Sequence, residues 1–180
     1  MKPLQLAPIL GLPWKIYPTV VPGSALLLAL LVAVARLAIG LDWLIAVVGG
    51  LLGVLIFWLC DLVHNYGHAI AARATGHPMI GIKFFWILAG NIYPSNEPAL
   101  PAATHIRRAL GGPIANALLT VLGGALLWVL RATTGLTHWL TLWFFVLNLF
   151  YYTLQVFLPL GFNDGATIWK YLRKLKASSP

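Results

Sequence analysis

The sequence has very little charge. Only 9% of its 180 residues are Asp, Glu, Lys or Arg, whereas 60% are hydrophobic. A soluble domain usually carries about 25% charged residues. A protein of this composition has too few polar groups to cover its apolar surface in water, so we expect an integral membrane protein. The length suits a single domain.

Acidic residues and cysteine are especially scarce. Four acids, Asp42, Asp61, Glu97 and Asp164, stand against twelve Lys and Arg, which gives a net charge of +8. The basic residues flank apolar segments and do not form an aqueous face, so the expected partner is the lipid bilayer and not nucleic acid. Cys60 is the only cysteine, which excludes an intrachain disulfide.

Four apolar stretches are long enough to cross a membrane as helices, which takes about 20 residues each. They cover residues 20–41, 43–73, 109–130 and 139–160. The predicted fold class is an all-α membrane protein, a polytopic bundle of about four transmembrane helices. We expect this transmembrane domain to span residues 20–169.

The two ends of the protein differ from this domain. Residues 1–19 hold four prolines and no continuous apolar run, so they are predicted to be an interfacial segment and not a signal peptide. Residues 170–180 are predicted to form a basic C-terminal tail, helical at first and disordered at Ser178 to Pro180.

The distribution of basic residues predicts the orientation. With four crossings, only Arg36 and Arg131 lie on the side opposite the termini, and the other ten Lys and Arg share the side of both termini. Cytoplasmic loops are enriched in Lys and Arg. Both termini are therefore predicted to be cytoplasmic.

Residues 75–108 form a long insert between the second and third stretches. Its segment 79–87 is rich in β-branched and aromatic residues, and a turn signal follows at Gly90-Asn91. We predict a short β-hairpin at the membrane surface, whose open edge can bind an extended peptide by strand addition. A plain re-entrant or interfacial loop is the alternative.

Two histidines stand four residues apart in the second stretch. On a helix such positions share one face, so His64 and His68 can reach the same metal ion. A catalytic zinc ion typically has three protein ligands, so a third must come from elsewhere. Asp164 is the best candidate, because the second and fourth helices run in the same direction and end at similar depth.

Histidines in a membrane helix can also serve as hydrogen-bonding groups between helices. Here, however, Asp61 lies close to His64 and His68 in a span that is otherwise apolar. Ionisable groups in a membrane are expensive and are usually functional. The metal site is therefore the favoured interpretation.

Three motifs resemble those of the site-2 protease family, the intramembrane zinc metalloproteases. Residues 64–69 (HNYGHA) resemble the family's His-Glu-x-Gly-His-Ala, and residues 112–116 (GPIAN) resemble its Gly-Pro-x-x-Asn. Residues 159–165 (PLGFNDG) resemble the end of its Asn-x-x-Pro-x-x-x-x-Asp-Gly. The motifs match in order and spacing, and the resemblance covers roughly residues 41–169.

The resemblance implies zinc-assisted hydrolysis of peptide bonds in membrane-embedded substrates. It implies that His64, His68 and Asp164 hold Zn²⁺. It also places Asn116 near the active site, as a contact to the substrate or to the oxyanion. The substrate is expected to be a transmembrane or extended peptide.

The sequence departs from the family at three positions. Val156 replaces the asparagine before the proline, and Ala166 replaces the glycine that often follows Asp-Gly. The serious departure is Asn65, which stands where the family has its catalytic glutamate. That glutamate takes a proton from the attacking water and passes it to the leaving amine, which an amide cannot do.

Asp61 lies one turn before Asn65, on the same side of the predicted helix. We expect it to serve either as a hydrogen-bonding partner of His64 or as a displaced base. Metal-bound histidines usually donate their free N–H to a carboxylate or a carbonyl, which favours the first role.

Three functions follow from these observations. The first is a site-2-type protease whose activity is impaired by Asn65, either naturally or through a substitution that traps the enzyme. The second is a catalytically inactive pseudoprotease that binds membrane helices or metal. The third is a small metal-handling transporter, which leaves the motifs at residues 112–116 and 159–165 unexplained.

Overall fold

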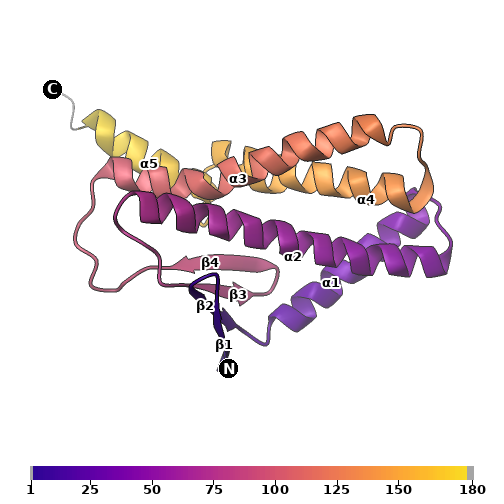
Figure 1. The fold of residues 1–180 in the computed structure, drawn as a ribbon, viewed down its shortest axis with the longest axis horizontal. Helices are drawn as coiled ribbons and strands as arrows, with labels where there is room; N and C mark the ends of the chain where they lie inside the picture. Colours follow the sequence, from indigo (N-terminus) through magenta and orange to yellow (C-terminus); the bar gives the residue numbers. More distant parts are fainter. Residues whose placement is uncertain (1, 178–180) are drawn as a thin grey trace.

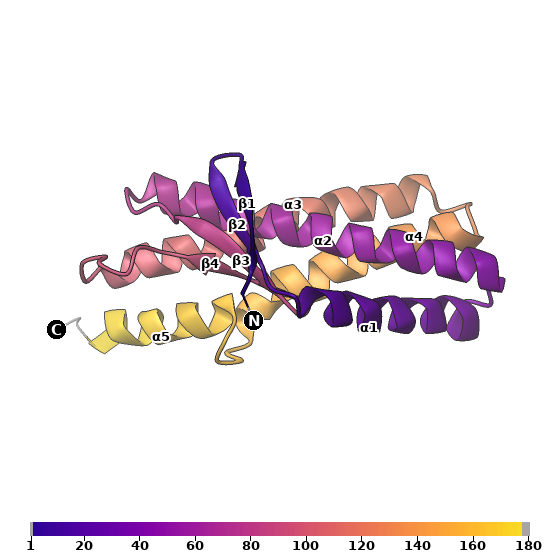
Figure 2. The same ribbon diagram turned by 90° about the horizontal axis from the view of Figure 1, so that it is seen from below.

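The computed structural model describes residues 2–177, which form a helical bundle with a small sheet against one side (Figures 1 and 2). The helices are α1 (Val20–Ala33), α2 (Trp43–Ala74), α3 (Ala102–Val129), α4 (Gly135–Val146) and α5 (Asp164–Ala177). A π-helical segment (Val34–Ala38) extends α1, and a π-helical (Leu147–Thr153) and a 3₁₀ segment (Leu154–Phe157) extend α4. The strands are β1 (Leu4–Ile9), β2 (Leu12–Ile16), β3 (Gly81–Phe85) and β4 (Leu88–Ile92).

The prediction of about four membrane-crossing helices is confirmed. Within residues 2–177, four helical segments are long and apolar enough to cross a membrane: Val20–Ala38, Trp43–Ala74, Ala102–Val129 and Gly135–Phe157. The α1–α2 and α3–α4 connections lie at one end of the bundle, as Figures 1 and 2 show. Arg36, in the π-helical segment at the end of α1, and Arg131, in the α3–α4 connection, are therefore at the same end of the bundle.

The spans have bounds that differ from those expected, and two of the differences have a local cause. Helix α3 begins at Ala102, inside the predicted insert, because Pro101 caps it in an extended conformation. The fourth span ends at Phe157 and not near residue 160. Leu158 precedes a proline, which disfavours helical geometry, and it is extended (φ −107°, ψ 113°).

The predicted hairpin is present, but its turn is not at Gly90-Asn91. Strands β3 and β4 pair antiparallel with Gly90 opposite Lys83 and Asn91 opposite Ile82, so both residues lie inside β4. The backbone turns at Trp86, which has a positive φ of 52°. The backbone of Trp86 packs so closely against Gly23 of α1 that a Cβ at Gly23 would lie 2.5 Å from it.

The first 19 residues contain two strands that the sequence did not predict. Strands β1 and β2 form an antiparallel hairpin, and β2 pairs parallel with β3, giving the order β1-β2-β3-β4. Leu10 and Gly11 form the turn with positive φ angles of 49° and 82°, as tight hairpin turns require. Residues 170–177 belong to α5, and the predicted disorder at 178–180 lies outside the described residues.

Small residues allow α2 and α3 to cross closely. A Cβ added at Gly67 would meet the carbonyl oxygen of Gly111, and one added at Gly111 would meet that of Gly67. Ala71 and Ala115 lie one turn further along each helix at the same crossing. Small residues four apart are typical of tightly packed membrane helices. This crossing sets the distance between the histidine pair on α2 and the 112–116 motif on α3.

Candidate metal centre

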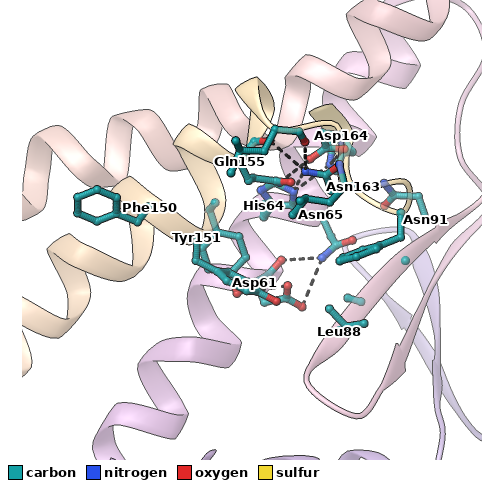
Figure 3. Close-up of a pocket in the computed structure, with 17 residues that line it drawn as sticks. Asp61, His64, Asn65, Leu88, Asn91, Phe150, Tyr151, Gln155, Asn163 and Asp164 are labelled. Carbon is teal, nitrogen blue, oxygen red and sulfur yellow. Dashed lines mark hydrogen bonds and ion pairs between the residues drawn. The ribbon is translucent and has the colours of Figure 1, made fainter. Parts of the chain in front are cut away.

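Two side chains of α2 and one that is about 100 residues further along the sequence converge beside α2. Figure 3 shows His64 and Asp164 at this place. His64 and His68 point from one face of α2, and Asp164 begins α5 after the loop that follows the fourth span. One ligand atom from each residue lies within 4.8 Å of the others. The structure therefore brings together the three residues that the sequence suggested as metal ligands.

The donor atoms have the spacing that zinc needs. The Nε2 atoms of His64 and His68 are 3.1 Å apart, and they lie 3.1 and 3.3 Å from the two carboxylate oxygens of Asp164. Zn–N bonds of about 2.0–2.1 Å at tetrahedral angles put two ligand nitrogens about 3.3 Å apart. The donor set of two imidazoles and one carboxylate thus fits zinc.

The outer nitrogens of both imidazoles have partners that fix the rings. His64 Nδ1 lies 3.0 Å from Asn116 Oδ1, and His68 Nδ1 lies 2.8 Å from the carbonyl oxygen of Arg108. If each Nδ1 carries the proton and donates to its oxygen, each Nε2 presents a lone pair to the shared centre. Such partners orient the ring of a metal-binding histidine and raise its basicity.

Gly112 leaves room for both rings. A Cβ at this position would lie 2.5 Å from His68 Nε2 and 2.6 Å from His64 Nε2. Contacts this short are impossible for real atoms, so a side chain here would push the imidazoles apart. The glycine of the second motif is therefore required for a steric reason.

Asn116 of α3 lies next to His64, with its Oδ1 3.0 Å from His64 Nδ1. Its side chain is fully buried behind His64 and borders neither of the two cavities beside the histidines. Its amide donates to the carbonyl of Cys60 and to Asn148 Oδ1, which leaves Oδ1 free to accept from His64. Asn116 is thus the hydrogen-bonding partner of His64 Nδ1, a role for which the sequence suggested Asp61.

Asn148 supports the site, although the sequence motifs did not point to it. This residue is 0% exposed and donates to Cys60 Sγ and to the carbonyl of Phe144. Its role had a signal in the sequence, because a lone asparagine in an apolar span is costly unless it has partners. Asn148 holds Asn116, which in turn holds His64.

Asp164 is held by residues close to it in the sequence. Gln155 donates to its Oδ2 at 3.0 Å. A Cβ at Gly165 would meet the carbonyls of Gln155 and Leu158, so only glycine lets α5 start this close to the fourth span. Burial favours the neutral carboxyl, but His68 and His64 outweigh it and keep the pKa of Asp164 below its usual range.

Asp61 and Asn65 line a cavity of about 360 Å³ that opens beside the histidines. The Asn65 amide donates to the backbone carbonyl of Asp61 at 2.7 Å, and Asp61 Oδ2 is 3.5 Å from the same nitrogen. Tyr152 donates to Asp61 Oδ1 at 3.3 Å. Asp61 is thus a buried carboxylate on the wall of the cavity, separate from the three converging ligands.

A buried ion pair supports the other side of His68. The guanidinium of Arg108 lies 3.0 Å from both carboxylate oxygens of Glu97 and 3.4 Å from the ring centre of Tyr93. These groups border a second cavity of about 190 Å³ on the side of the bundle that carries α5. Because Arg108 also supplies the carbonyl for His68, the pair fixes the backbone that orients a ligand.

No protein-family model and no curated protein matches this sequence. Among solved structures, the fold is similar to the site-2 protease from Methanocaldococcus jannaschii, with a TM-score of 0.60. The match covers 97% of this chain and 73% of that one, at 17% sequence identity.

The protein has a site-2 protease fold. The resemblance first seen in three short motifs thus extends to the whole arrangement of helices and sheet. Together with the four apolar helices, the site-2 protease fold makes this an integral membrane protein. The candidate metal-ligand group lies between α2 and the start of α5, beside Gly112 of α3.

Proposed function

We propose that this protein is a site-2-protease-like intramembrane zinc metalloprotease whose hydrolytic activity is impaired by Asn65. The observation that carries the proposal is the convergence of His64, His68 and Asp164 on one centre inside a site-2 protease fold. A zinc ion held there would supply Lewis-acid chemistry, polarising a water molecule and a peptide carbonyl.

The surroundings of the cavity suit a membrane-embedded peptide. Its rim carries apolar side chains that are well exposed, among them Phe150, Leu158, Leu160 and Phe162, the last 77% exposed. Side chains of this kind on a membrane protein face lipid or another apolar segment. Strand β4 is one of the two edge strands of the sheet, and it is the one that borders this cavity, so an extended segment of the substrate can pair with it.

Asn65 limits the chemistry of this site. The side chain of Asn65 is a neutral amide, so it neither titrates nor carries a proton to a leaving group. Asn65 is 2% exposed, and its amide donates a hydrogen bond to the backbone carbonyl of Asp61. General acid–base catalysis contributes about 10²–10⁴-fold to a rate. The hydrogen bond from the Asn65 side chain to the backbone of its own helix also favours the second candidate, a pseudoprotease that binds metal and membrane helices without cutting them.

The decisive experiment compares the unaltered protein with Asn65→Glu and Asn65→Gln in lipid nanodiscs. Glutamine matches glutamate in size but has no titratable proton, so it isolates the effect of the base. Zinc content is measured by mass spectrometry, and cleavage is followed on a synthetic single-span peptide. We expect zinc in all three forms and cleavage that is about 10²–10⁴-fold faster in Asn65→Glu than in Asn65→Gln.

Each other outcome has a clear meaning. If none of the three forms binds zinc, the metal-site assignment fails. If all bind zinc and Asn65→Glu still does not cut the peptide, the pseudoprotease is the better description. Cleavage by the unaltered protein would point to another base, for which Asp61 is the candidate on the cavity wall.

A further inference from the structure

One buried side-chain atom of the protein has no hydrogen-bond partner among the described residues. Among residues 2–177, Asn91 Oδ1 is the only buried side-chain nitrogen or oxygen without a hydrogen-bond partner. Native proteins leave few buried polar atoms unpaired, and each such atom calls for an explanation. Asn91 lies in β4, the edge strand of the sheet.

The position of Asn91 relates it to the metal ligands. The larger cavity is lined by Asp61 and the apolar rim, and the smaller one by Arg108 and Glu97. Only His68, Asn91 and Asp164 border both cavities. Asn91 therefore lies where the two cavities meet, together with two of the three converging residues. Figure 3 shows its side chain on the wall of the larger cavity.

The packing of the protein does not explain an amide at this place. Ala89 of β4 and Tyr93 just after the strand, each two residues away from Asn91, pack against the apolar cluster that contains Ile82 and Phe84. A buried amide atom left unpaired disfavours folding by about 1–3 kcal/mol, whereas an apolar side chain would avoid that cost. Asn91 Oδ1 is therefore free to accept a hydrogen bond from a partner outside the described residues.

The chemistry of a carboxamide identifies that partner. An asparagine side chain offers one acceptor oxygen and a donor N–H₂, the same pair of groups that a peptide unit presents. It can therefore accept from a backbone N–H and donate to a backbone C=O of an adjacent strand. The free edge of β4 is the place where an extended peptide would bring such groups.

We propose that Asn91 is a substrate-binding residue that hydrogen-bonds the backbone of an extended peptide beside the metal centre. The inference rests on the proposed function, since it assumes that a peptide enters the larger cavity. It assigns Asn91 to recognition of the backbone and not of a particular side chain. Binding through Asn91 is thus tolerant of substrate sequence.

The test measures binding of a fluorescein-labelled single-span peptide with an extended Gly/Ser segment next to its helix. The unaltered, zinc-loaded protein in nanodiscs is compared with Asn91→Leu, which removes the amide at similar size. Asn91→Thr, which suits a strand, serves as a second variant in case leucine disturbs the fold. A second peptide carries N-methyl groups in the extended segment, which remove its backbone donors.

We expect Asn91→Leu to weaken binding about five- to thirty-fold, the effect of losing one or two hydrogen bonds. N-methylation of the peptide should weaken binding of the unaltered protein, but it should weaken binding of Asn91→Leu less, because the partners are coupled. Zinc content should stay the same, and the melting temperature should stay the same or rise. A residue with a purely structural role would lower the melting temperature instead.

Other results overturn the inference in distinguishable ways. Equal affinity of the unaltered protein and both variants would exclude Asn91 from peptide binding while leaving the proposed function intact. Reduced affinity accompanied by a lower melting temperature and lost zinc in both variants would show a structural role. No peptide binding by the unaltered, zinc-loaded protein would overturn both this inference and the proposed function.

Discussion

The side-chain amide of Asn65 donates a hydrogen bond to the backbone carbonyl of Asp61, one helical turn earlier on α2, at 2.7 Å. The residue at the position of the expected base is thus tied to its own helix. The titratable side chain nearest to it on the cavity wall is that of Asp61, which is buried and accepts from Tyr152. This relationship decides what the site can do as it stands.

Any cleavage by the unaltered protein should depend on Asp61. We expect Asp61→Asn to abolish residual cleavage, because it removes the only carboxylate on the cavity wall besides Asp164. Zinc content should not change, since Asn116 and not Asp61 holds His64. In the Asn65→Glu background the same change should leave cleavage largely intact. Unchanged residual cleavage in Asp61→Asn would remove Asp61 from the mechanism.

Gly112→Ala should destroy the metal site. The added methyl would overlap the Nε2 atoms of His68 and His64, which must separate to avoid it. Zinc bound per molecule, measured by mass spectrometry after gel filtration, should fall to near zero. Gly124→Ala is the matched control on the same helix, because its methyl would meet only ring carbons of Phe145 at 3.5 Å or more. Full zinc occupancy in Gly112→Ala would mean that the ligands are arranged differently.

Asn116→Ala should weaken zinc binding without removing a ligand. Loss of an outer partner of a metal-bound histidine typically lowers metal affinity about 10- to 100-fold. Competition with a chromogenic chelator measures this affinity. Thr120→Ala serves as the control, because Thr120 lies one turn further along α3 and contacts only the carbonyl of Asn116 and the hydroxyl of Thr153 through its own hydroxyl. Equal affinity in the two variants would show that His64 does not need Asn116.

Glu97→Gln should destabilise the protein around His68. It leaves the buried guanidinium of Arg108 without its counter-charge, which lowers the free energy of unfolding by up to about 3 kcal/mol. The melting temperature in detergent should fall, and zinc affinity should fall with it, since the Arg108 carbonyl orients His68. Replacing both partners is less harmful than removing one, so Glu97→Gln with Arg108→Met should recover part of the loss. An unchanged melting temperature in Glu97→Gln would show that the pair contributes little.

The local parts of this structure could be predicted from the sequence. Four apolar stretches determine four membrane helices, because a backbone in lipid must satisfy its own hydrogen bonds. A spacing of four residues puts His64 and His68 on one face for the same local reason. The hairpin of the insert also followed from its composition, although its turn did not, because Gly90 and Asn91 are held inside β4 by pairing with β3.

Contacts between distant segments needed the tertiary structure. Nothing in the sequence indicates that residues 14–16 pair with residues 82–84, because parallel pairing depends on where α1 and α2 place the two strands. The partner of His64 was misplaced for a similar reason. Helical geometry puts Asp61 near the histidines, but only the close crossing of α2 and α3 at Gly67 and Gly111 brings Asn116 to the ring. Local spacing sufficed to pair His64 with His68 as candidate ligands, whereas the groups that hold their rings depend on how the helices pack.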